Sequence, residues 1–189
     1  SPAPLAGGSL ERAGHGARHA EEEEVKNAAL VLAGVWLGAL VASWVAATVN
    51  FRTVDRVLGA DQRPELARTL DPVSREDRRQ ALRHLASEIN RWSFRWWSAA
   101  QLALAGVLLL LAWRMPGPRA ALLAAALIVA GQLLLVRPIV DLGRAIDFVP
   151  RPLPPEIARR FGLMHAAFVI GDLAKAALLV LAAWLLGRR

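Results

Sequence analysis

The chain has 189 residues and a formal net charge of +7, and 55% of its residues are hydrophobic although 21% are charged. Apolar and charged residues occupy separate segments, which excludes an ordinary soluble domain, where the two classes are mixed. The chain has no Cys, so disulfides and thiolate metal ligands are excluded. Most basic residues lie beside apolar segments, where they would face lipid headgroups, so we expect no nucleic-acid binding.

Residues 1–27 contain no apolar segment, and an acidic run, Glu21 to Glu24, lies near their end. Such a Gly-, Ala- and charge-rich segment has too little apolar surface to join a core. We therefore predict a flexible tail over residues 1–27, followed by a single membrane domain over residues 28–189.

The first predicted span covers residues 28–49, which carry no charged side chain. A helix of this length crosses the roughly 30 Å of hydrocarbon in a bilayer. Beyond it we predict a coiled linker over residues 51–72, with a helix stop at Gly59 and a short helix after Pro64.

Small residues recur at every fourth position of this span. They are Gly34, Gly38, Ala42 and Ala46. In lipid, a stripe of small residues lets two helix backbones approach closely. Two alternatives follow: the stripe packs against another helix of the same chain, or it forms the seam of a homodimer through Gly34 and Gly38.

Ser74 and Asp77 form a helix start that resembles a capping box, ahead of an amphipathic segment. No helix breaker separates this segment from the second predicted span, residues 94–113. We therefore predict one long helix that lies on the membrane surface, or projects from it, before it crosses. Three tryptophans fall where an aromatic belt is expected: Trp92, Trp96 and Trp97.

A tight turn at residues 115–118 makes the second span and the third, residues 120–136, antiparallel neighbours. The third helix is expected to continue, bent, past Pro138. A proline-rich connector then leads to a helix that is predicted to begin near Pro155 and to form the fourth span, residues 161–186.

Charges of alternating sign follow the third span at helical spacing. They are Arg137, Asp141, Arg144 and Asp147. Residues three and four apart on a helix can pair. The pattern indicates a solvated helix with internal salt bridges at the membrane edge.

The distribution of basic residues predicts the orientation in the membrane. The connectors after spans one and three hold ten and five Arg, whereas the tail, the turn after span two and the C-terminus hold three, two and two Lys or Arg. Connectors rich in Lys and Arg stay in the cytoplasm. We therefore expect a multi-pass protein with both termini outside. The heavy use of Ala, Leu and Arg, with only two Lys, is typical of a GC-rich bacterial genome and indicates the bacterial inner membrane.

The fourth span carries an acid and a base near its middle. His165, Phe168, Asp172 and Lys175 share one helical face. A charge at the bilayer centre costs about 2.5–3.5 kcal/mol, so this face should point into the bundle. Either Asp172 and Lys175 form an internal ion pair that fixes helix packing, or they join the titratable His165 in a proton relay, ion path or ligand site.

Other spans place polar side chains at a similar depth. Gln132 and Thr48 are expected level with His165, and Gln101 nearer the depth of Asp172. A polar site drawn from all four helices is therefore geometrically possible. Of the four His, His165 alone lies in a span, and a bis-His haem needs two at one depth. We predict no metal, no cofactor and no catalytic residue.

Three stretches resemble the transmembrane-protein-205-like family, whose members are four-span membrane proteins without an assigned activity. Residues 34–58 (GVWLGALVASWVAATVNFRTVDRVL) resemble its first span, residues 132–141 (QLLLVRPIVD) the exit of its third, and residues 160–173 (RFGLMHAAFVIGDL) the start of its last. The chain departs from the family at Val49-Asn50, where a Pro is usual, and at Gly171-Asp172, where an Asn is usual. The resemblance implies an all-α bundle of about four spans.

The sequence favours a non-enzymatic membrane protein that acts as an accessory or scaffold subunit of a larger membrane assembly. Its expected contacts are the lipid bilayer and other membrane subunits, or a second copy through the small-residue stripe. The alternative is a small transporter or an ion- or proton-conducting protein that uses His165, Asp172 and Lys175.

Overall fold

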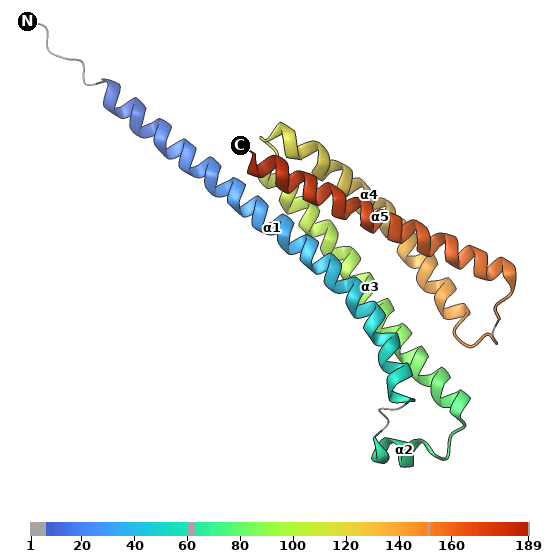
Figure 1. Ribbon diagram of the computed structural model, residues 1–189. Helices are drawn as coiled ribbons and strands as arrows, with labels where there is room; N and C mark the ends of the chain where they lie inside the picture. Colours follow the sequence, from blue (N-terminus) through green and yellow to red (C-terminus); the bar gives the residue numbers. More distant parts are fainter. Residues whose placement is uncertain (1–6, 60–62, 151, 189) are drawn as a thin grey trace, which may run out of the picture.

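The computed structural model describes residues 7–59, 63–150 and 152–188, and these ranges contain helices and no strand. The helices are α1 (Gly7–Val57), α2 (Pro64–Leu70), α3 (Arg75–Leu111), α4 (Pro116–Ala145) and α5 (Pro155–Gly187). Both α1 and α4 contact α3 and α5. The four long helices therefore surround a common core as a four-helix bundle, and α2 lies in the connector between α1 and α3 (Figure 1).

Four helices of the described chain are long and apolar enough to cross a membrane. Many of their large apolar side chains point away from the bundle: Leu110, Leu127 and Leu134 are 72–79% exposed. A surface of this kind suits lipid, since in water it would favour aggregation. The prediction of an all-α, multi-pass membrane bundle is confirmed.

The predicted start of α3 is confirmed. The Ser74 hydroxyl accepts a hydrogen bond from the backbone N–H of Asp77 at 3.1 Å and donates one to its carboxylate at 2.6 Å. The capped helix then continues unbroken through Leu111, which confirms one long helix running into the second span. Prolines open α4 and α5 in their first turn, where a missing N–H costs no hydrogen bond, and α4 continues past Pro138 as predicted.

The first helix differs from the prediction at both ends. It begins at Gly7 rather than near residue 28, and its first part projects beyond the bundle (Figure 1). Ala, Glu, Arg and Lys are good helix formers, and no Pro interrupts the described part of this segment, so it continues the helix of the span. The flexibility of the tail stays a prediction, and residues 1–6 lie outside the described part.

At its other end, α1 continues to Val57, so residues 51–57 are helical rather than coiled. The reason is again the absence of a breaker, and the helix stops just before Gly59, as expected. A side chain at Gly59 would lie 3.0 Å from the carbonyl oxygen of Asp55, which explains a glycine there. The short helix after Pro64 is confirmed as α2.

Two apolar clusters of unequal size form the core. The larger one includes Trp36, Leu108, Val129 and Leu179. The smaller one contains Val136, Val140 and Phe168, with Phe94 packed against it. It lies nearer the end of the bundle that bears the connectors after α1 and α4. On α3, α4 and α5, the buried polar residues fall between these two clusters in sequence.

Candidate functional site

Asp172 and Lys175 form an ion pair inside the bundle. The Nζ atom of Lys175 lies 2.7 Å from Oδ1 of Asp172, and their side chains are 0% and 9% exposed. They are three residues apart on α5, so one helical face carries both charges inward. The pair has no net charge, which reduces the cost of holding it at membrane depth.

Residues of α1 and α3 complete the surroundings of the Lys175 ammonium group. Nζ donates a hydrogen bond to Oε1 of Gln101 at 2.5 Å, and the indole N–H of Trp36 donates to the same oxygen at 3.4 Å. Nζ also lies 5.9 Å from the centre of the Phe168 ring, within the range of a cation–π contact. The ammonium group is thus bound directly from α3 and α5, and Trp36 of α1 supports the Gln101 oxygen that it binds.

Residues of α1 and α4 hold the Asp172 carboxylate. The amide nitrogen of Gln132 donates to Oδ1 at 3.0 Å, and the indole N–H of Trp44 donates to Oδ2 at 3.0 Å. The Gln132 nitrogen also donates to the backbone carbonyl of Phe168 at 2.8 Å. We call the six side chains of this network the polar layer: Trp36, Trp44, Gln101, Gln132, Asp172 and Lys175.

Gly171 makes room for the polar layer. A Cβ at this position would lie 2.7 Å from the Gln132 amide nitrogen and 3.3 Å from a methyl carbon of Ile128. Any larger residue would therefore displace Gln132 or push α4 and α5 apart. Gly171 and Asp172 act together, because the glycine leaves space for the Gln132 amide, which donates a hydrogen bond to the Asp172 carboxylate.

Two predicted members lie outside the layer. His165 is exposed and stacks on Phe161, with ring centroids 6.1 Å apart. Thr48 is also exposed, and its hydroxyl donates to the carbonyl of Trp44 in its own helix. At the end of the bundle that bears the connectors after α1 and α4, the first part of α5 diverges from α1 (Figure 1).

Sequence reasoning missed Trp36 and Trp44 as donors in the layer. The sequence placed Trp92, Trp96 and Trp97 in an aromatic belt; Trp92 and Trp96 are 60% and 64% exposed, whereas Trp97 packs against the larger apolar cluster. Trp36 is fully buried instead. A tryptophan well inside a span usually finds a partner for its N–H, and that signal could have linked Trp36 and Trp44 to acceptors at the same depth.

The small-residue stripe faces away from the bundle. Gly34, Gly38, Ala42 and Ala46 are all exposed. A Cβ at Gly34 or Gly38 would meet no atom of another described element within 4 Å. The stripe therefore does not pack against another helix of the described chain, contrary to one of the two alternatives predicted. The core is instead contacted by the other face of α1, which carries Ala33, Trp36 and Leu40.

A second charged network joins α3 to the end of α4, before the second span and beyond the third. Glu88 binds Arg144 at 2.9 Å and Arg91 at 2.7 Å, and Arg91 binds Asp147 at 2.6 Å. The alternating charges beyond span three thus pair mainly across helices, and only Arg137 and Asp141 pair as expected, at 3.8 Å.

We call Glu88, Arg91, Arg144 and Asp147 the edge network. Hydrogen bonds within it lower the pKa values of its two acids. Bonds from Arg144 and then Arg91 lower the pKa of Glu88 to about 2. Burial raises the pKa of Asp147, but hydrogen bonds from Arg91 and His84 outweigh it, and the net direction is downward. Both acids therefore stay charged at neutral pH.

The same network contains one group with the ligand types of a metal site. Ligand atoms of His84, Glu88 and Asp147 all lie within 4.8 Å of one another. Arg91 and Arg144 already bind the two carboxylates, so a cation would have to displace guanidinium groups. The residues are better explained as a salt-bridge network than as metal ligands.

No protein-family model matches this chain, and neither a curated protein nor a solved structure is significantly similar to it.

Proposed function

We propose that this chain is a non-enzymatic scaffold or accessory subunit of a membrane assembly, with the stripe on α1 as its contact face. The observation that carries the proposal is the exposure of Gly34, Gly38, Ala42 and Ala46 on a helix that spans the membrane. Small residues allow close helix packing in lipid. The stripe therefore suits a helix from outside the described chain.

The polar layer supports a structural role for the interior. Lys175 and Gln101 are 0% and 1% exposed, so neither contacts solvent. On one side lies the larger apolar cluster, and on the other Phe94 and Phe168 pack as a tilted pair with ring centroids 4.4 Å apart. A layer so enclosed, with donors and acceptors from all four helices, holds the bundle together.

The occupant we propose is a transmembrane helix of another protein subunit. Gly38→Leu places a large side chain on the stripe, and Gly106→Leu is the matched control, because Gly106 is exposed on α3 and a Cβ there also meets nothing within 4 Å. After purification in mild detergent, the partner should accompany the wild type and the control, and be lost from Gly38→Leu.

The outcomes distinguish the alternatives. A wild-type dimer without other proteins that Gly38→Leu converts to a monomer assigns the stripe to a second copy. A lone wild-type monomer by light scattering and mass spectrometry contradicts the scaffold proposal. Retention of the partner by Gly38→Leu shows that the contact face lies elsewhere.

The second candidate is a small transporter or proton-conducting protein that uses His165, Asp172 and Lys175. One observation favours it: Oε1 of Gln132 is buried beside the ion pair and receives no hydrogen bond from the described residues. A bound ion or proton carrier could satisfy that oxygen. In reconstituted vesicles, Asp172→Asn should abolish flux if this candidate is right, and unchanged flux rejects it.

The location also belongs to the proposal. The excess of Arg in the connectors after spans one and three supports an orientation with both termini outside, and the heavy use of Ala, Leu and Arg supports a bacterial inner-membrane protein. Residues 34–58, 132–141 and 160–173 support membership of the transmembrane-protein-205-like family. Reporter fusions at each terminus test the orientation, since an enzyme active only outside the cytoplasm should work at both ends.

A further inference from the structure

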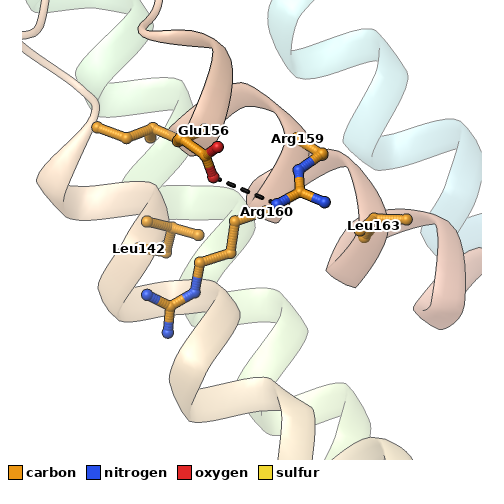
Figure 2. Close-up of a pocket in the computed structure, with 6 residues that line it drawn as sticks. Leu142, Glu156, Arg159, Arg160 and Leu163 are labelled. Atoms are coloured by element: carbon orange, nitrogen blue, oxygen red, sulfur yellow. Dashed lines mark hydrogen bonds and ion pairs between the residues drawn. The ribbon is translucent and has the colours of Figure 1, made fainter.

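A pocket of about 380 Å³ lies between the last part of α4 and the first turns of α5, away from the polar layer. It is lined by Leu142, Glu156, Ile157, Arg159, Arg160 and Leu163 (Figure 2). Its residues flank the start of the fourth span, where a helix passes from water into lipid. We therefore expect the pocket to lie at the depth of lipid headgroups.

The lining combines apolar and cationic side chains. Leu142, Ile157 and Leu163 supply its apolar part, and Leu163 is 63% exposed toward the surroundings. In Figure 2 the Arg160 side chain extends toward Leu142 on α4, and the ion pair of Glu156 with Arg159 lies beside it. An apolar surface next to a guanidinium suits a ligand that has both an acyl chain and an anionic group.

Of the two arginines that line the pocket, Arg160 is available to bind an anion. Arg159 binds Glu156 at 3.3 Å, so these two charges offset each other. Arg160 has no hydrogen bond or ion pair with a described residue that would compete for its guanidinium. Arginine binds phosphate oxygens through two parallel N–H donors, which gives such a site its geometry.

The start of α5 adds a positive field. Pro154 caps the helix without a side-chain hydrogen bond, and Pro155 follows in the first turn. The next N–H groups have no acceptor within the helix, as in any first turn, and the helix dipole is positive at this end. An anion beside Glu156 and Ile157 would thus be favoured by backbone as well as by Arg160.

We propose that this pocket binds the phosphodiester headgroup of an anionic phospholipid, with Arg160 as its main ligand. The acyl chains follow Leu142 and Leu163 into the bilayer. A zwitterionic lipid carries an added cation on the same headgroup, which Arg160 and the helix end repel. Free phosphate shares the anionic chemistry but makes no use of the apolar wall.

The test is native mass spectrometry of the full chain released from bilayers that mix phosphatidylglycerol and phosphatidylcholine. The wild type should retain phosphatidylglycerol in preference. Arg160→Gln should weaken that retention on the order of ten-fold, the usual effect of one hydrogen bond to a charged group. Arg137→Gln is the matched control, because Arg137 is 92% exposed at the same end of the molecule and lies outside the pocket.

Three results would overturn the proposal. One is equal retention of the two lipids by the wild type. Another is an equal loss in Arg160→Gln and Arg137→Gln, which indicates only diffuse attraction to an anionic surface. The third is complete displacement of the lipid by inorganic phosphate, which assigns the pocket to a soluble anion. Because Arg160 is exposed, its replacement should leave the fold intact, and thermal unfolding of the variant checks this.

Discussion

The polar layer and the edge network both join helices through ion pairs, but they do so in different surroundings. In the layer, one acid and one base, Asp172 and Lys175, share a site that is closed to solvent. At the membrane edge, Glu88 and Arg144 have side chains that are 32% and 46% exposed. Water and salt can therefore replace a lost partner of Glu88 or Arg144, but not one of Lys175.

The comparison explains why the layer needs so few charges and so many neutral donors. Each ion there is expensive to leave without a partner, so Gln101, Gln132 and two indoles complete its hydrogen bonds. The edge network instead uses two acids and two arginines in a chain. We therefore expect the burial of an ion pair, rather than the number of ion pairs, to decide how much a network contributes to the stability of the bundle.

The largest expected effect comes from Lys175→Leu, which leaves Asp172 buried without its cation. Breaking a buried pair in this way costs about 3–5 kcal/mol, whereas replacing both partners with apolar residues is often neutral. The double variant, Asp172→Leu with Lys175→Leu, removes both charges but leaves Gln101, Gln132 and Trp44 without these partners, so in detergent it should unfold moderately below the wild-type temperature. The single variant should unfold far below it.

This pair of variants also separates structure from transport. A double variant that folds and keeps the cellular phenotype supports the scaffold. A double variant that folds and loses a measured flux supports the transporter. Equal destabilisation by the single and double variants would contradict the view that the ion pair serves mainly to neutralise itself.

A smaller effect is expected from Gly171→Ala. Its Cβ would lie 2.7 Å from the Gln132 nitrogen, so Gln132 must move away from Asp172 or the helices must separate. Overpacking of this kind costs about 1–3 kcal/mol. Gly162→Ala on the same helix is the control, because its Cβ meets nothing within 4 Å, and it should stabilise slightly. Similar unfolding temperatures for the two variants would show that Gln132 does not depend on Gly171.

Much of the fold could be predicted from the sequence, because apolar runs, prolines and Ser74 each act locally. The inward face of α5 was also predictable, since two charges three residues apart leave only one acceptable direction in lipid. Which face of α1 points into the core could not be predicted. Both of its faces are apolar or small, so periodicity alone could not tell the core side, with Trp36, from the stripe with Gly34 and Gly38.

The site was predicted in part for a related reason. Counting residues was enough to bring Gln101 to the ion pair, but it placed Gln132 level with His165, whereas Gln132 binds Asp172, seven residues further along α5. It could not show that the first part of α5 diverges from α1 (Figure 1), because that depends on how the helices cross. Nor could it rank Trp44 above Thr48, since the choice rests on which side chain reaches Asp172.

The smallest effect on stability is expected when the pH is lowered far enough to protonate Glu88 in the edge network. The pKa of Glu88 is about 2 in the folded chain and about 4.5 in its ordinary state. The folded chain therefore binds fewer protons, and Glu88 stabilises it fully above pH 4.5 and progressively less as the pH falls toward 2. Unfolding temperatures of the wild type and Glu88→Gln should differ most at neutral pH and converge below pH 4.5.

Because Glu88 is partly exposed, the difference should be a fraction of the Lys175→Leu effect and shrink further in high salt. A gap as large as that of Lys175→Leu, or one that grows in acid, would mean that the edge network and the polar layer do not differ in the way their surroundings imply.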